Sequence, residues 1–76
     1  MLFRLSIGEN GTPWGKQTII HTGEAKNAIE FVRNYAMDAF AVLNPTDAYS
    51  LIEACWVDAG EDTIAIAVQN LKWYDR

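Results

Sequence analysis

The sequence predicts a small α+β domain of the order ββαββ, in which one helix packs on one face of an antiparallel sheet. Three observations support this class. The 76 residues are 50% hydrophobic and 21% charged, which is the balance of a chain that folds into one globular domain, here residues 1–76. Residues 2–7 alternate between apolar and polar side chains, as a half-buried strand does. Residues 25–43 instead place apolar side chains three or four positions apart, as a helix with one buried face does.

The first two strands are expected to form a hairpin with a long connection. The first strand occupies residues 2–7. The next eight residues, Gly8–Gly15, contain three glycines and one proline, a composition that is typical of loops. Residues 16–22 are rich in β-branched side chains and supply the second strand.

The helix that follows has one continuous apolar stripe. Thr22 can cap its start, and the pair Asn44-Pro45 ends it, because the residue before a proline is driven out of the helical conformation. The polar side chains between residues 26 and 34 fall on the opposite face, which we expect to be solvated. The stripe consists of Ala25, Ala28, Ile29, Val32, Ala36, Ala39, Phe40 and Leu43.

The segment 45–60 has two interpretations. In the favoured one, a strand from about Tyr49 to Val57 turns at residues 59–61 and pairs with a final strand. In the alternative, Asn44 and Pro45 begin a second helix over residues 45–59, and a final strand follows it. The hairpin is favoured because one register gives an apolar face along both strands, in the pairs Trp56–Ile64, Ala54–Ile66 and Ile52–Val68.

Acidic residues are concentrated in the second half of the chain. The formal net charge is −4, and residues 34–71 contain six acidic and no basic residues. Residues 1–33 contain four basic and three acidic residues. A nucleic-acid-binding protein needs a basic patch to neutralise phosphates, so direct binding to DNA or RNA is disfavoured. A protein with a basic surface is the partner that this charge fits.

The residues with catalytic chemistry do not form a known pattern. His21 and Cys55 are the only pair that combines a base with a nucleophile near neutral pH, and the sequence places no basic residue near Cys55 to activate its thiol. Residues 11–17 lack the glycine spacing and the following helix of a phosphate-binding loop. One histidine and one cysteine also fall short of the three or four ligands of a zinc site. We therefore expect no enzyme activity, no metal and no cofactor.

Two groups of residues are candidates for binding a partner. Three carboxylates lie at the tip of the predicted final hairpin, where Asp58 would face Asp62 and the group could contact Arg or Lys side chains. Three aromatic residues lie in the first loop and near the C-terminus, and such side chains dominate binding hot spots. The alternative is that the tryptophans close the ends of the small core. The candidates are Trp14, Asp58, Glu61, Asp62, Trp73 and Tyr74.

The sheet face opposite the helix is a candidate homodimer interface. One helix covers only one face, and the other face is predicted to be more apolar than a solvated surface. Two copies stacked sheet to sheet about a two-fold axis would bury it, whereas in a monomer the Gly8–Gly15 loop and the C-terminal aromatic residues would cover it. The predicted interface residues are Tyr49, Leu51, Val57 and Leu71.

These patterns favour a small acidic protein-binding module over an enzyme. By analogy, such chains act as inhibitors or adaptors, including inhibitors carried by phages and mobile elements that occupy a basic surface of a host protein. The alternative is a homo-oligomeric structural or assembly protein with no foreign partner. The longest apolar run, Ala39–Leu43, is far below the ~20 residues of a membrane-spanning helix, and no export signal is visible. A cytoplasmic protein that does not contact membranes is expected.

Overall fold

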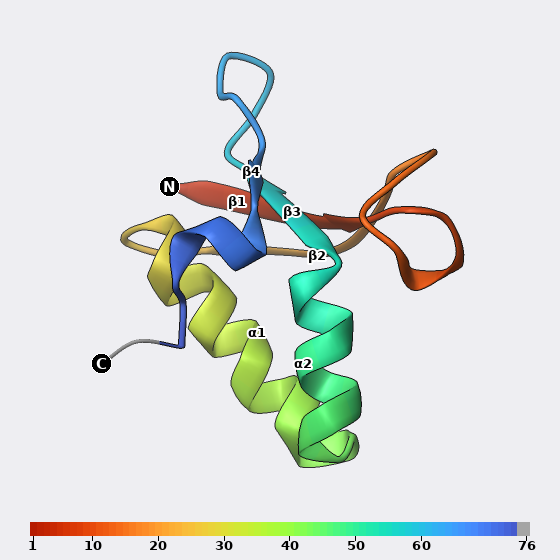
Figure 1. The fold of residues 1–76 in the computed structure, drawn as a ribbon. Coiled ribbons are helices and arrows are strands. Elements are labelled where there is room, and N and C mark those ends of the chain that lie inside the picture. Colours follow the sequence, from red (N-terminus) through yellow and green to blue (C-terminus); the bar gives the residue numbers. More distant parts are fainter. Residues whose placement is uncertain (75–76) are drawn as a thin grey trace.

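A four-stranded antiparallel sheet with two α-helices on one face makes up the computed structural model, which describes residues 1–74 (Figure 1). The strands lie in the order β2-β1-β3-β4, so the central pair joins the N-terminus to the second half of the chain. The predicted α+β class with an antiparallel sheet is confirmed. The elements are β1 (Leu2–Ile7), β2 (Thr18–Glu24), α1 (Ala28–Val42), α2 (Pro45–Glu53), β3 (Cys55–Asp58) and β4 (Ile66–Ala67), with short 3₁₀ helices at Glu9–Gly11 and Val68–Leu71.

Residues 45–53 form α2, so the predicted strand from Tyr49 to Val57 is wrong in its first half. Two local signals begin the helix. The Asn44 side chain accepts a hydrogen bond from the Asp47 amide at 2.9 Å, and Pro45 occupies the first turn, where its missing N–H costs nothing. The alternative helix over residues 45–59 is right about this start and too long at its other end.

The chain changes from helix to strand within two residues. Ala48 and Ile52, one helical turn apart, are fully buried, and Cys55 and Val57, two residues apart, are buried as well. The first spacing needs a helix and the second needs a strand. Burial of both pairs against the same core therefore ends α2 at Glu53 and begins β3 at Cys55.

The pairing of β3 with β4 is shifted by three residues from the predicted hairpin. Trp56 lies opposite Ala67 rather than Ile64, and residues 59–65 form a loop in place of the tight turn. An odd shift exchanges the two faces of a strand, so the predicted apolar face is inverted. Val57 is buried in the core, Trp56 lies on the opposite face, and Ile64 is 86% exposed.

The core lies between the sheet and the two helices. The rings of Phe3 on β1 and Phe31 on α1 stack with their centroids 5.6 Å apart. Within the described residues, neither helix combines the length and the apolar character that crossing a membrane requires. The buried cluster consists of Phe3, Leu5, Phe31, Val32, Ala36, Ala39, Ala48, Ile52, Cys55, Val57, Val68 and Trp73.

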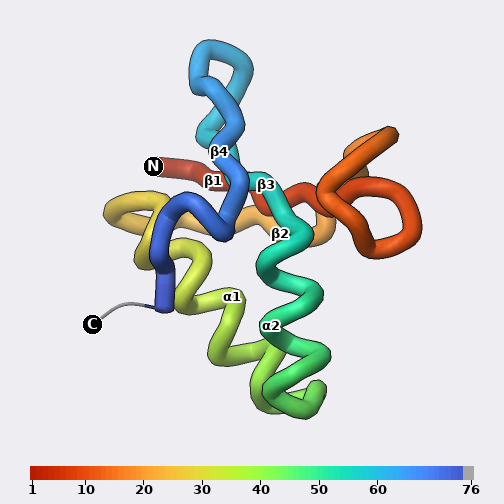
Figure 2. Tube along the Cα trace, viewed as in Figure 1, coloured from red at the N-terminus to blue at the C-terminus, as the bar shows by residue number. Residues whose placement is uncertain are grey.

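Two loops project from the sheet. The β1–β2 loop extends beyond one end of the sheet, and the 59–65 loop rises on the side opposite the helices, as the Cα trace shows (Figure 2). An ion pair fixes the base of the second loop: the Arg4 guanidinium lies 2.7 Å from Asp58 Oδ1, which also accepts a hydrogen bond from the Gly60 amide at 3.1 Å. The 59–65 loop is thus tied to the sheet rather than to the helices.

Ile52 and Ile64 test which residues of this segment lie in the core, because the predicted hairpin places both on the buried face. Replacing the fully buried Ile52 by alanine is expected to lower the free energy of unfolding by about 2–5 kcal/mol, because a cavity is left in the core. The same replacement at the exposed Ile64 should change it by less than about 0.5 kcal/mol. Urea unfolding followed by circular dichroism measures both values. Equal losses would mean that Ile64 packs beneath the helices, as the predicted hairpin requires.

Candidate protein-interaction surface

The sheet face opposite the helices carries both apolar and charged side chains. The strand register places Ile19, Ser6 and Trp56 in one row across β2, β1 and β3. Ser6 is only 8% exposed although no helix covers this face, whereas Ile19 is 52% exposed and Trp56 is half-buried. The neighbouring row contains the Arg4–Asp58 ion pair. This outer face therefore combines an apolar strip with a neutralised charge pair.

Internal hydrogen bonds give the β1–β2 loop a defined conformation. The Glu9 amide donates to the Trp14 carbonyl at 2.9 Å and closes the loop. Inside it, the Thr12 hydroxyl donates to the Glu9 carbonyl at 2.7 Å and accepts from the Trp14 amide at 3.3 Å. The loop is thus closed by backbone groups and one threonine, without any contribution from the Trp14 side chain.

Glycine is required at two places in this loop for different reasons. A Cβ at Gly8 would lie 2.2 Å from the Trp14 carbonyl oxygen, a contact that backbone atoms cannot relieve cheaply. Gly15 has φ of 78°, in the left-handed region that other residues rarely adopt. The glycines that marked the loop in the sequence therefore determine its shape.

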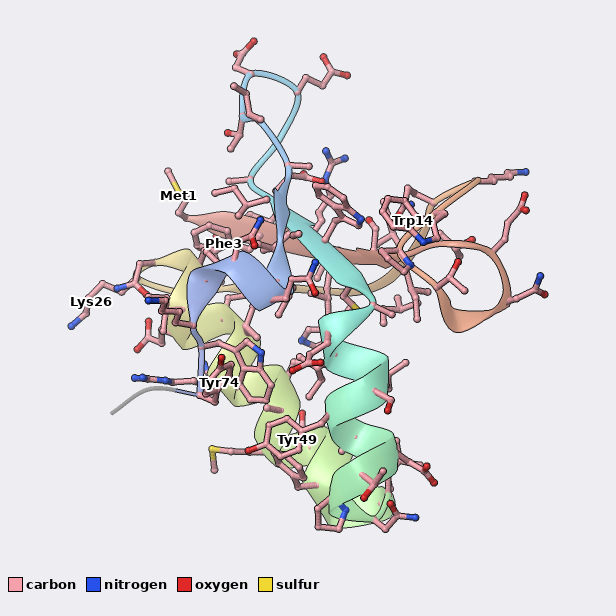
Figure 3. The ribbon with its side chains drawn as sticks, in the orientation of Figure 1. Met1, Phe3, Trp14, Lys26, Tyr49 and Tyr74 are labelled. Atoms are coloured by element: carbon pink, nitrogen blue, oxygen red, sulfur yellow. The ribbon has the colours of Figure 1, made fainter. Side chains whose placement is uncertain are left out.

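Trp56 attaches the loop to the outer face of the sheet. Its indole N–H donates to the Pro13 carbonyl at 3.0 Å, and the Gln17 side-chain amide donates to the same oxygen at 3.1 Å. Trp14, the next residue, is 72% exposed and lies at the end of the sheet, as its labelled side chain shows (Figure 3). Sequence reasoning missed Trp56 because it assigned this side chain to the helix-covered face.

The predicted acidic tip is present in part. Glu61 and Asp62 are exposed in the 59–65 loop and have no ion-pair partner among residues 1–74. Asp58 does not face Asp62, because it lies in β3 opposite Arg4. Its carboxylate is partly buried and already paired, so the prediction that it joins the binding tip is not supported by the geometry.

The C-terminal aromatic residues lie elsewhere. Trp73 is only 3% exposed and packs in the core, its ring centroid 5.5 Å from that of Tyr49, so its prediction as a docking anchor is wrong. Its carbonyl accepts a hydrogen bond from Arg33 Nε at 2.7 Å, and its indole N–H has no partner among residues 1–74. Tyr74 is half exposed, on the helical side and away from Trp14 (Figure 3).

A shallow apolar groove of about 320 Å³ lies on that helical side. α1 lines it with Met37 and Phe40, α2 with Tyr49, and the C-terminal segment with Trp73 and Tyr74. The rings of Phe40 and Tyr49 meet edge to face at 5.2 Å. Tyr74 therefore belongs to the rim of this groove and not to the outer face of the sheet.

The structure does not bring together the four residues predicted for the dimer interface, because they do not share a sheet face; the dimer itself stays a prediction. Tyr49 and Leu51 lie on α2, Val57 is only 2% exposed, and Leu71 packs against the core from the second 3₁₀ helix. The inverted face of β3 accounts for Val57, whereas Tyr49 and Leu51 were misplaced because residues 45–53 form a helix, and Leu71 because residues 68–71 do. Once Val57 enters the core, the open face receives Arg4, Ser6, Trp56 and Asp58 instead.

The residues with catalytic chemistry are engaged in packing. The Cys55 thiol donates to the Leu51 carbonyl at 3.1 Å, and burial raises its pKa to about 12. The His21 ring stacks on Phe31 with centroids 5.5 Å apart and lies 5.1 Å from the Tyr35 ring. Burial is also the main cause of the raised pKa of Tyr35. Among residues 1–74, no three histidine, cysteine or carboxylate side chains gather closely enough to hold a metal ion.

Comparison with known proteins found no relative of this chain. No protein-family model matches the chain, and neither the curated proteins nor the solved structures contain a significant match.

The buried thiol predicts a loss of stability at high pH. The folded state holds the Cys55 proton up to a pH of about 12, whereas the unfolded chain releases it near the ordinary value of 9.0. Stability from this group is therefore complete below pH 9 and is lost as pH rises from there to 12. The free energy of unfolding is measured with urea at about pH 8 and at about pH 10.5. Between these pH values it should fall by about 1–2 kcal/mol more in the wild type than in Cys55→Ala. The same fall in both proteins would contradict the assignment.

Proposed function

We propose that this protein is a non-enzymatic, acidic binding module that acts by occupying a basic surface of another protein. The observation that carries the proposal is the helix-free side of the molecule, where an exposed tryptophan and an acidic loop project beside one sheet face (Figure 3). A protein that covers a surface of its partner in this way needs no catalytic residues. It requires only that apolar and charged contacts be offered together.

The charge of this surface favours a basic partner. Arg4 neutralises Asp58 at the base of the 59–65 loop, so the exposed carboxylates of Glu61 and Asp62 leave the loop with net negative charge. Residues 34–71 contain no basic side chain, and in the β1–β2 loop the charge of Lys16 is matched by that of Glu9. A surface of one sign attracts a surface of the other and accelerates their encounter.

The state of the two reactive side chains supports binding rather than catalysis. A thiol with a pKa of about 12 holds almost no thiolate near neutral pH, so Cys55 is a poor nucleophile. His21 lies in a stack of aromatic rings, with Phe31 and Tyr35 as its neighbours. Packing in the folded protein thus accounts for the positions of both side chains without a catalytic role.

Charge reversal in the acidic loop tests the proposal. The double variant Glu61→Lys/Asp62→Lys is compared with Asp38→Lys/Glu53→Lys, which makes the same change of net charge at exposed sites on α1 and α2. Tagged proteins are incubated with lysate of the source cells, and the stoichiometric partner of the wild type is then titrated by calorimetry. We expect an affinity loss of at least about tenfold for the loop variant only, and a weaker wild-type affinity at higher salt.

Two results would overturn this proposal. Equal affinity of the loop variant and the helix variant would mean that the acidic loop does not contact the partner. Light scattering that shows self-association of the wild type, with no foreign protein bound, would instead support the homo-oligomeric alternative.

A further inference from the structure

The three tryptophans of this chain have different roles. Trp73 fills the core, and Trp56 lies half-buried on the sheet with its N–H bonded to Pro13. Trp14 is 72% exposed and belongs to no buried cluster. Trp14 is the one tryptophan whose side chain is mostly exposed, and an exposed tryptophan is typical of a binding hot spot.

The loop that carries Trp14 is ordered without help from this side chain. Its closing contacts are the Glu9 amide, the Thr12 hydroxyl and the Pro13 carbonyl, which receives hydrogen bonds from Trp56 and Gln17. None of these contacts uses the indole. The conformation is therefore fixed before any partner arrives, and binding need not order the loop.

We propose that the β1–β2 loop is a pre-formed anchor that inserts the Trp14 indole into an apolar pocket on the partner protein. The inference rests on the proposed function in so far as it needs a protein partner. The indole supplies apolar area and one N–H donor, so the matching pocket is lined by apolar side chains and offers a hydrogen-bond acceptor. The acidic 59–65 loop, tied to the same sheet face through Asp58, places basic residues at the rim of that pocket.

Trp56 is the positioning residue of this anchor. It contacts the loop through the Pro13 carbonyl, one residue before the indole, and its own ring shares the outer face with Ser6. Trp56→Phe removes the N–H donor and keeps an aromatic ring on the sheet. The loop should then exchange its closing amide hydrogen, that of Glu9, faster than in the wild type.

The first experiment needs no partner. Trp14→Ala should keep the melting temperature within about 2 °C of the wild type, because the indole is 72% exposed and belongs to no buried cluster. A fall of more than about 5 °C would show that Trp14 stabilises the fold and would overturn the inference.

The second experiment uses the partner captured by the wild type. Trp14→Ala is expected to weaken its binding by at least about 30-fold, the effect of losing a hot-spot residue. The matched control is Tyr74→Ala, which truncates another exposed aromatic side chain on the helical side and should leave affinity within about twofold. Insertion of the indole should also shift its fluorescence to shorter wavelength, measured as the difference between the wild type and Trp14→Phe.

The third variant separates positioning from contact. Trp56→Phe should weaken binding several-fold, which is less than the effect of Trp14→Ala. The amide hydrogen of Glu9 should exchange faster, and the variant should still contact the same residues of the partner. Unchanged exchange at Glu9 would remove Trp56 from the positioning role.

The outcomes distinguish this inference from the proposed function. If Trp14→Ala binds normally while Glu61→Lys/Asp62→Lys does not, the anchor is wrong and the acidic module stands. If Trp14→Ala loses binding and the charge-reversed protein does not, the anchor stands and the basic partner is wrong. Self-association that requires Trp14, with no foreign protein bound, would overturn both.

Discussion

The alternation of side chains along β3 is the constraint on which the rest of the structure depends. Burial of Cys55 and Val57 in the core forces Trp56 and Asp58 to the opposite face of the sheet. There the Trp56 indole holds the β1–β2 loop by Pro13, and the Asp58 carboxylate binds Arg4 and the Gly60 amide at the base of the 59–65 loop. One short strand thus completes the core on one side and fixes both projecting loops on the other.

The first half of the fold was predictable because its signals are local. The alternation of residues 2–7, the glycines of the first loop and the apolar stripe of α1 each need only neighbouring residues. Residues 45–58 contain a helical period followed by a strand period, and an alternating apolar pattern spans the boundary. Contacts of Ala48 and Ile52 with the distant core decide between them, and local patterns along the chain do not reveal those contacts.

The candidate surface was predictable in composition and not in geometry. Trp14, Glu61 and Asp62 were found because exposed aromatic and acidic residues in loops have a recognisable pattern. Trp56 was missed and Trp73 misplaced because the direction of one side chain depends on register and that of the other on tertiary packing. The inverted face of β3 moved Trp56 outward and Val57 inward, and the helix at residues 45–53 removed Tyr49 and Leu51 from the sheet.

Hydrogen bonds stabilise the conformation of the β1–β2 loop, whereas the exposed Trp14 side chain adds little to the stability of the fold. Fixing a loop residue costs about 1–2 kcal/mol of backbone entropy, and an internal hydrogen bond returns about 1 kcal/mol. The bonds of Glu9, Thr12, Trp56 and Gln17 thus offset part of the cost of holding the loop, while the indole, 72% exposed, adds little buried surface. The proposed contact with a partner would account for the position of Trp14, and the outer sheet face, which has no third layer, is where such a contact can form without disturbing the core.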